Sequence, residues 1–279
     1  MNKFAVLYVG CLAVFCAQTA VASSCRFSAL RTAAIDGGPF HQVVISAGAG
    51  DLRVRGDKSL TTPRASGKAC ASSQELLDKM QIEVRSEGDT LYIKAEFPEA
   101  DRGGFFDNDS VSLDLSVDVP ETMPADVVDS SGDANISGTG STSVTDSSGD
   151  LSISNIYGDL SVIDSSGSID IQSVAGNMQL RDSSGDVDVA DVTGNLDIPV
   201  DSSGDLRLRR IGGHLQIGTD SSGDIVIQQV QRNVTIDRDS SGDINVDEVG
   251  GDLAVRADAS GDIAHSRIQG KTDLPAGRH

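Results

Sequence analysis

The residues most able to do chemistry are aspartates that recur in one short word of the sequence. The word Asp-Ser-Ser-Gly-Asp occurs six times, and two variants extend the series to eight copies. The eight copies begin at Asp129, Asp146, Asp164, Asp182, Asp201, Asp220, Asp239 and Asp258. If like residues stack about 4.8 Å apart, neighbouring carboxylates repel by about 1 kcal/mol in water, and by more in a lower dielectric. Such an arrangement needs something that offsets the repulsion.

Two kinds of chemistry can offset this repulsion. In the first, each leading Asp accepts hydrogen bonds from the N–H groups of its own turn, while the glycine takes a positive φ. In the second, neighbouring carboxylates share cations, of which Ca²⁺ best suits oxygen ligands. The calcium alternative takes its ligands from four successive words: Asp182, Asp186, Asp201, Asp205, Asp220, Asp224, Asp239 and Asp243.

The spacing favours the turn over a calcium site. Calcium-binding β-rolls repeat G-G-x-G-x-D every nine residues and supply ligands from both of their turns. The second turn of each repeat here is only Gly-Asp, Gly-Asn, Gly-His or, at one point, Arg232-Asn233. We therefore predict structural turns and no resident cofactor, with Ca²⁺ binding as the alternative.

Catalytic chemistry is a further alternative. Enzymes on β-helices, such as carbohydrate-active ones, need two carboxylates in distinct environments, whereas nearly all these aspartates share one environment. The four histidines form no cluster, and His214 replaces a turn Asn or Asp. The one basic run, Arg207, Arg209 and Arg210, is expected to pair with Asp188, Asp191 or other flanking acids, with a local anion site as the alternative. We predict no catalytic residue and no cofactor-binding residue, and thus no enzyme.

The elements that position the aspartates follow from the repeat itself. Successive words are 17 to 19 residues apart, and each repeat holds two apolar-x-apolar triplets, such as Leu206-Arg207-Leu208 and Leu215-Gln216-Ile217. This alternation is typical of strands with one buried face, and so short a strand cannot bury its face unless neighbouring repeats stack. A third apolar residue, such as Ile211, is expected to fill a corner of the core. The sequence predicts an all-β protein: a parallel β-solenoid of about eight coils over residues 121–270.

Residues 23–120 differ from the repeats and predict a mainly-β cap for the first coil. Residues 111–119 alternate without a fault before Pro120. A short helix is predicted at about 73–80, with Ser72 as its cap and Glu75 three positions later. The polar tail, residues 271–279, is expected to shield the last coil. A solenoid needs such covers because its ends expose unpaired strand edges.

The first 22 residues read as a secretory signal peptide. Lys3 precedes an apolar run from Phe4 to Cys16, and Ala20-Val21-Ala22 has the small-residue pattern of a cleavage site. A lipoprotein signal ending at Cys25 is the minority alternative. Removal of residues 1–22 leaves two cysteines, Cys25 and Cys70, which predict one disulfide in an oxidising compartment. We expect an exported protein of the periplasm or the extracellular cell envelope, without a transmembrane segment in the mature chain.

Composition excludes several partners. The chain of 279 residues has 42 acidic and 22 basic side chains, a net charge of −20, and no Lys/Arg cluster, which argues against nucleic acid and anionic lipid. It has no tryptophan and 4% aromatic residues, so a stacking platform for sugars is not expected. An unidentified protein or envelope surface remains as the predicted partner.

Several segments also resemble a known group. They are residues 27–30 (FSAL), 50–56 (GDLRVRG) and 113–120 (LDLSVDVP), followed by the serial Asp-Ser-Ser-Gly-Asp words. Together they resemble the bacterial putative-adhesin family of exported β-strand-repeat proteins of unknown function. This resemblance implies a β-solenoid in the cell envelope and brings no catalytic residues. The function we predict is a non-enzymatic scaffold or adhesin-like interaction surface.

Overall fold

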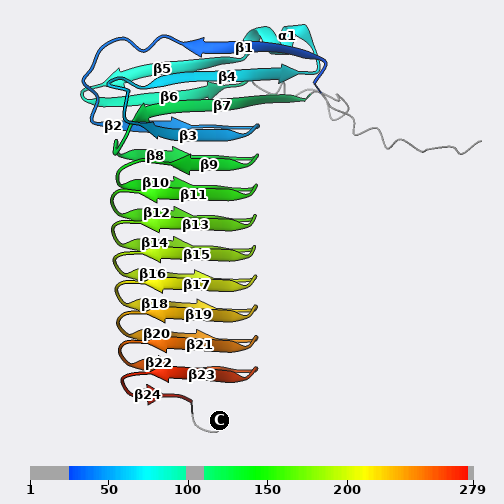
Figure 1. Ribbon diagram of the computed structural model, residues 1–279. Coiled ribbons are helices and arrows are strands. Elements are labelled where there is room, and N and C mark those ends of the chain that lie inside the picture. Colours follow the sequence, from blue (N-terminus) through cyan, green and yellow to red (C-terminus); the bar gives the residue numbers. More distant parts are fainter. Residues whose placement is uncertain (1–24, 99–109, 276–279) are drawn as a thin grey trace, which may run out of the picture.

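The computed structural model describes residues 25–98 and 110–275. In these ranges the chain forms two twelve-stranded sheets, named sheet A and sheet B, and one short helix, α1 (Gln74–Lys79). The two sheets form the opposite walls of a rod, and β1 and α1 lie at its N-terminal end (Figure 1). The predicted signal peptide, residues 1–22, lies outside the described residues.

Each sheet runs along the rod. Sheet A contains, in spatial order, β1 (Phe27–Ala33), β4 (Arg64–Ala71), β7 (Val111–Pro120), β3 (Leu52–Asp57), β9 (Ala134–Ser137), β11 (Leu151–Ile156), β13 (Ile169–Val174), β15 (Val187–Val192), β17 (Leu206–Ile211), β19 (Ile225–Val230), β21 (Ile244–Val249) and β23 (Ile263–Ile268). Sheet B contains, in the reverse direction along the rod, β24 (Thr272–Asp273), β22 (Leu253–Val255), β20 (Val234–Asp239), β18 (Leu215–Asp220), β16 (Leu196–Asp201), β14 (Met178–Arg181), β12 (Leu160–Ile163), β10 (Thr142–Thr145), β8 (Ala125–Val128), β2 (Gln42–Ser46), β6 (Thr90–Glu96) and β5 (Gln81–Glu87).

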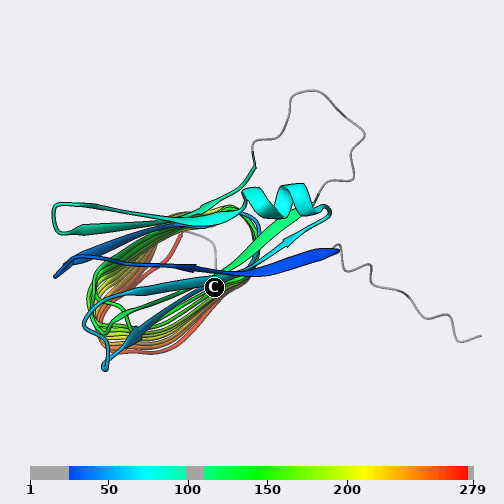
Figure 2. The ribbon, with the colours of Figure 1, turned by 90° about the horizontal axis from the view of Figure 1, so that it is seen from above.

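From β8 onward the chain alternates between the two sheets. Each strand pairs in parallel with the equivalent strand of the next coil, so that Leu206 lies beside Ile225 in sheet A and Leu215 beside Val234 in sheet B. Seen along the rod, the coils superpose on one another (Figure 2). The predicted parallel β-solenoid, with coils of about 19 residues, is confirmed.

Small aliphatic side chains fill the space between the sheets. In β17, Leu206, Leu208 and Ile211 are completely buried, whereas Arg207 is exposed. Ile211 breaks the simple alternation because Arg210, just before it, has a φ of +57°. This left-handed residue turns the chain so that the third apolar residue also points inward, which confirms the predicted corner position. Large rings have no room in so narrow a core.

The N-terminal strands belong to the same two sheets as the repeats. Strand β2 pairs in parallel with β8, and β3 pairs in parallel with β9. Strand β2 also pairs in parallel with β6, and β3 with β7. Beyond β6 and β7 the pairing becomes antiparallel, β7 with β4 and β4 with β1 in sheet A, and β6 with β5 in sheet B. The stack therefore changes from parallel to antiparallel at this end.

The N-cap of helix α1 lies one residue later than the cap proposed from the sequence. Ser73 is its N-cap, and its hydroxyl accepts the N–H of Leu76 at 3.3 Å. The prediction of Ser72 as the cap was wrong, because the Ser72 hydroxyl accepts the N–H of Ser110 at 3.2 Å, on the chain leading into β7. Arg31 of β1 donates to the carbonyls of Leu77 and Met80, both at 2.7 Å, and so binds the end of the helix.

One disulfide joins Cys25 to Cys70, with Sγ atoms 2.05 Å apart. Cys70 lies in β4, the strand next to β1, so the bond fixes the start of the described chain to sheet A. The predicted pairing is present in the structure. In the part of the chain that the structure describes, no helix is long and apolar enough to span a bilayer.

Candidate functional site

The eight acidic words stack along one edge of the rod and form two distinct columns. The inner Asp column contains the first residue of each word: Asp129, Asp146, Asp164, Asp182, Asp201, Asp220, Asp239 and Asp258. The outer Asp column contains the fifth: Asp133, Asp150, Asp186, Asp205, Asp224, Asp243 and Asp262, with Ser168 in the remaining place. The eight calcium candidates are thus divided equally between a column that points into the rod and one that faces solvent.

The outer Asp column is a ladder of hydrogen bonds from coil to coil. The carboxylate of Asp186 accepts the N–H of Asp205 at 3.0 Å, and the same bond recurs from Asp205 to Asp224 at 3.0 Å and from Asp224 to Asp243 at 2.9 Å. Each carboxylate therefore serves the backbone of the next coil. This role occupies one of its two oxygens, and in Asp205 the other oxygen pairs with Arg207.

The serine and glycine of each word also join neighbouring coils. The second serine donates its hydroxyl to a carbonyl one coil earlier, as Ser222 does to Ser202 at 3.4 Å and Ser241 to Ser221 at 3.2 Å. Gly204 has a φ of +122°, and a Cβ at this position would overlap the carbonyl oxygen of Gly185. The word is therefore a stacking device, in which glycine is required both for its φ and for close approach.

The inner Asp column is buried. Its members from Asp129 to Asp239 are at most 3% exposed. Asp129, Asp146 and Asp182 each accept the N–H of the following serine at 2.7 to 2.8 Å, as the turn hypothesis predicts. Asp201, Asp220 and Asp239 have both carboxyl oxygens without a well-formed hydrogen bond from a donor.

Burial changes the acidity of the inner Asp column. Loss of hydration is the largest cause and raises the pKa of Asp201 to about 6, with the charge of Asp182 as a further cause. Burial followed by contact with Asp201 raises the pKa of Asp220 to about 7, and burial followed by the charge of Asp220 raises that of Asp239 to about 7. These side chains therefore change protonation near neutral pH.

A second ladder runs along the other turn of the coils. Asn177 N–H donates to Asp159 at 2.7 Å, Asn195 N–H to Asn177 at 3.0 Å, and His214 N–H to Asn195 at 2.8 Å. At the next step the ring Nδ1 of His214 accepts the N–H of Asn233 at 3.4 Å. His214 thus takes the place of a turn Asn or Asp, as the sequence suggested, and this place belongs to a structural ladder.

The basic departure from the repeat is neutralised by acids of the preceding coil. Arg209 contacts Asp188 at 2.7 Å, and Arg210 contacts Asp191 at 2.6 Å. The hydrogen bond from Arg210 holds the pKa of Asp191 below its usual range. Arg207 pairs with Asp205 of its own turn at 2.7 Å. The predicted pairing of this run with Asp188 and Asp191 is therefore present.

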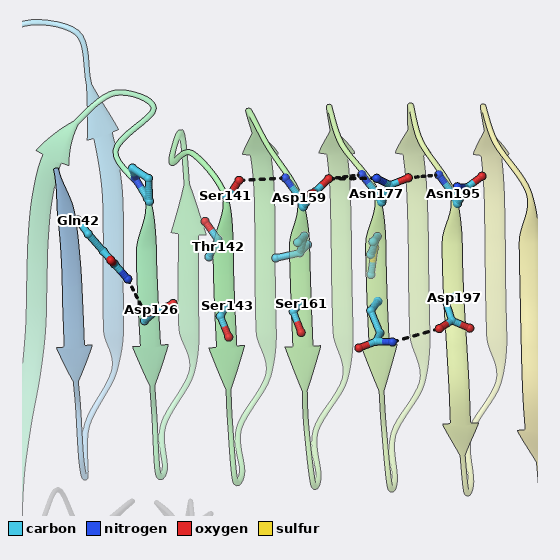
Figure 3. Close-up of a pocket in the computed structure, with 14 residues that line it drawn as sticks. Gln42, Asp126, Ser141, Thr142, Ser143, Asp159, Ser161, Asn177, Asn195 and Asp197 are labelled. Atoms are coloured by element: carbon cyan, nitrogen blue, oxygen red, sulfur yellow. Dashed lines mark hydrogen bonds between the residues drawn. The ribbon is translucent and has the colours of Figure 1, made fainter.

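The outward face of sheet B carries an open groove of about 550 Å³. It crosses strands β8, β10, β12, β14 and β16, and Gln42 of β2 lies at one end (Figure 3). Its lining combines apolar surface, to which Pro124, Leu160 and Met178 contribute, with two rows of hydroxyl, amide and carboxylate groups. The turn row contains Ser141, Asp159, Asn177 and Asn195, and the strand row contains Asp126, Ser143, Ser161, Gln179 and Asp197.

Two further bonds order the strand row of the groove. The amide of Gln42 donates to Asp126 at 2.6 Å, and the amide of Gln179 donates to Asp197 at 3.1 Å. No Lys or Arg lines the groove. Within residues 25–98 and 110–275, no three His, Cys, Asp or Glu side chains are grouped so that they could hold one metal ion. The arrangement can bind by hydrogen bonds over an extended, regular surface.

The ladders and the left-handed corners were not predicted from the sequence. Corner positions Asn155, Ser173, Asp191, Arg210, Gln229, Glu248 and Arg267 all have φ between +53° and +63°. Their signal was the change from apolar-x-apolar to two polar residues before the third apolar residue. The outer ladder had a signal too, since a side chain in register with its own copy one coil on is placed to accept that residue's N–H.

The fold and the stacked words define a class: a β-solenoid of short coils joined by acidic Ser-Gly turns. Within this class, the family model described as Toastrack DUF4097 matches residues 71–273, and the chain belongs to that family. No curated protein matches the chain significantly.

Solved structures resemble the chain at low identity. A putative lipid binding protein from Parabacteroides distasonis is 18% identical, with a TM-score of 0.45, over 88% of this chain and 96% of that one. A putative adhesin from Parabacteroides merdae is 12% identical, with a TM-score of 0.45, over 88% and 95% of the two chains. A putative adhesin from Bacteroides fragilis is 11% identical, with a TM-score of 0.44, over 90% and 99%.

Proposed function

We propose that this protein is a non-enzymatic, exported β-solenoid that acts as a scaffold or adhesin-like interaction surface of the cell envelope, with the groove of sheet B as its contact face. The observation that carries this proposal is the open groove on the outward face of sheet B. Its turn row already joins neighbouring coils through the ladder of Asp159, Asn177 and Asn195. Its strand row presents hydroxyl, amide and carboxylate groups on successive coils.

The chemistry of the groove favours a partner rich in hydrogen-bond donors. Carboxylates at Asp126, Asp159 and Asp197 accept hydrogen bonds, and Ser143 and Ser161 offer hydroxyls. A cationic or hydroxyl-rich envelope surface suits this lining, whereas an anionic one is repelled by these carboxylates and by the net charge of −20. Repetition of similar groups on successive coils suits an extended partner.

Export is supported by the cysteine usage of the chain. The bond between Cys25 and Cys70 needs an oxidising compartment, such as the periplasm or the exterior. The same bond uses the sulfur that a lipid anchor on Cys25 would need. Export through the signal peptide at residues 1–22, with location in the periplasm or the extracellular envelope, is part of this proposal.

Binding to purified envelope fractions tests the proposed contact face. The groove variant carries Ser161→Arg and Gln179→Arg, which are cross-coil neighbours in sheet B. The matched control carries Ser154→Arg and Gln172→Arg, which are cross-coil neighbours on the opposite sheet, in β11 and β13. Mature chains with residues 23–279 are incubated with peptidoglycan sacculi and with outer-membrane vesicles, and the bound fraction is measured after sedimentation.

We expect the wild-type chain and the control to bind one of these fractions, and the groove variant to lose at least tenfold in affinity. Two guanidinium groups occupy the groove and offset two of its three carboxylate charges, which is enough to remove several hydrogen bonds. Equal binding by the two variants, or no sedimentation of the wild-type chain with either fraction, contradicts the proposal.

A further inference from the structure

The inner Asp column contains buried carboxyl groups that the proposed function does not use. Asp201, Asp220 and Asp239 are the last residues of β16, β18 and β20, and they are in register with one another across the three coils. They are at most 1% exposed. The register places Asp201 beside Asp220 and Asp220 beside Asp239, so neighbouring carboxyl groups act on one another.

These carboxyls are poorly supplied with donors. Both oxygens of each are buried without a well-formed hydrogen bond. The N–H of the following serine acts on each carboxyl and favours its ionised form, but burial outweighs this effect. An ionised carboxylate only accepts hydrogen bonds, so two ionised neighbours repel each other across such a contact. A buried charge of this kind is stable only if it is paired or neutralised.

The titratable groups that face the column are themselves acidic. The charge of Asp182, one coil before Asp201, raises the pKa of Asp201. The charge of Asp258, one coil after Asp239, raises the pKa of Asp239. At the other end, Asp51 and Asp146 act on Asp129. In the described part of the chain, no Lys, Arg or His is among the charges that shift these carboxyls. For Asp201, Asp220 and Asp239, the charges that act on each carboxyl are therefore those of other aspartates.

We propose that the inner Asp column is a chain of shared protons, in which a neutral carboxyl of one coil donates its O–H to the ionised carboxyl of the next. Each proton is taken from solvent and is held between two side-chain oxygens. It removes one negative charge and replaces a repulsion with a charge-assisted hydrogen bond, as occurs where two carboxylates share a site. The rod then becomes more stable in mild acid, which gives the fold a response to pH.

The direction of this response follows from the acidity of the column. The pKa values of Asp220 and Asp239 are raised to about 7, chiefly by burial, whereas an unfolded Asp titrates near 3.8. The folded chain therefore binds more protons than the unfolded chain between about pH 4 and pH 7. This contribution to stability is complete below about pH 4 and is lost as the pH rises through about 7.

Thermal unfolding at pH 5 and pH 8, in EDTA, tests the shared protons. Asp220→Asn removes the titrating group of the inner column and keeps its shape. Asp224→Asn is the matched control, because Asp224 belongs to the same word but to the exposed outer column, where an amide oxygen can still accept the N–H of Asp243. All three chains are residues 23–279 with the disulfide intact.

We expect the wild-type chain and Asp224→Asn to unfold at a higher temperature at pH 5 than at pH 8, and Asp220→Asn to lose a clear part of that difference. A wild-type midpoint that is equal or higher at pH 8 overturns the proposal. So does an Asp220→Asn chain that keeps the whole difference.

A second measurement does not depend on the variant folding. Potentiometric titration of the wild-type chain, native and in denaturant, gives the number of protons bound by each state. The proposal predicts that the native chain binds more protons than the denatured chain at pH 6. Equal or smaller binding by the native chain overturns it.

Discussion

At the scale of single residues, the glycine of each acidic word has the most restricted position in the coil. Gly204 combines a φ of +122° with a carbonyl of the preceding coil lying where a Cβ would stand. Either condition favours glycine, and together they leave no room for another residue. The serine before it and the aspartate after it each form a hydrogen bond to a neighbouring coil. Three of the five residues in the word therefore hold coils together, two by hydrogen bonds and the glycine by allowing close approach.

Replacement of this glycine tests the close approach. Gly204→Ala is expected to lower the free energy of unfolding by about 3 kcal/mol or more, because both the backbone and the next coil must shift. Gly88→Ala is the control, since Gly88 has a φ of +63° but open space around it, and should cost only about 1 kcal/mol. Urea denaturation of both variants gives the comparison. Equal losses would show that stacking does not constrain Gly204.

At the scale of elements, the sheet A strand depends on its left-handed corner. The residue before the third apolar position has a positive φ in seven successive coils, yet none of the seven is glycine. This strained residue turns Ile211 and its equivalents into the core. Each corner therefore costs about 1 kcal/mol of backbone strain, and the burial of the third apolar side chain offsets this cost.

A substitution at this corner is expected to stabilise the rod. Gln229 has a φ of +62°, and Asn tolerates this region better than Gln. Gln229→Asn should raise the free energy of unfolding by about 0.5 kcal/mol, allowing for the loss of its 3.3 Å bond to Glu248. Gln228→Asn, at the exposed neighbouring position without a positive φ, should give no gain. If the two variants change stability equally, the corner does not store strain.

The elements also show which features of the fold could be predicted from the sequence. The repeat spacing predicted the coils and the buried triplets, because stacking forces like residues into like places. The disulfide was predicted separately, from the two cysteines that remain after removal of residues 1–22. The ladders were missed, although their acceptors had been found, because the direction of each bond depends on the turn backbone. For the inner column, the prediction of an Asx-type turn described Asp129, Asp146 and Asp182, and it did not anticipate that Asp201, Asp220 and Asp239 would lack well-formed hydrogen bonds. Burial of a turn residue cannot be read from its sequence word.

At the scale of the whole molecule, the rod is a stack whose acidic residues join its coils. The outer column bonds backbone to side chain, the inner column needs protons, and the basic run pairs with acids one coil away. In this account none of these groups is a resident metal site. The same aspartates define the alternative, because a Ca²⁺ ion shared between neighbouring carboxylates would offset the same repulsion.

The response of stability to divalent metal tests this account most directly. Thermal unfolding of residues 23–279 is followed by circular dichroism at pH 8 in EDTA, in millimolar Ca²⁺ and in millimolar Mg²⁺. A specific site raises the midpoint by mass action on the folded state. We predict equal midpoints in the three solutions, or equal small shifts with both ions. A midpoint in Ca²⁺ well above that in Mg²⁺, removed by Asp220→Asn, would contradict the account and place a cation in the inner Asp column.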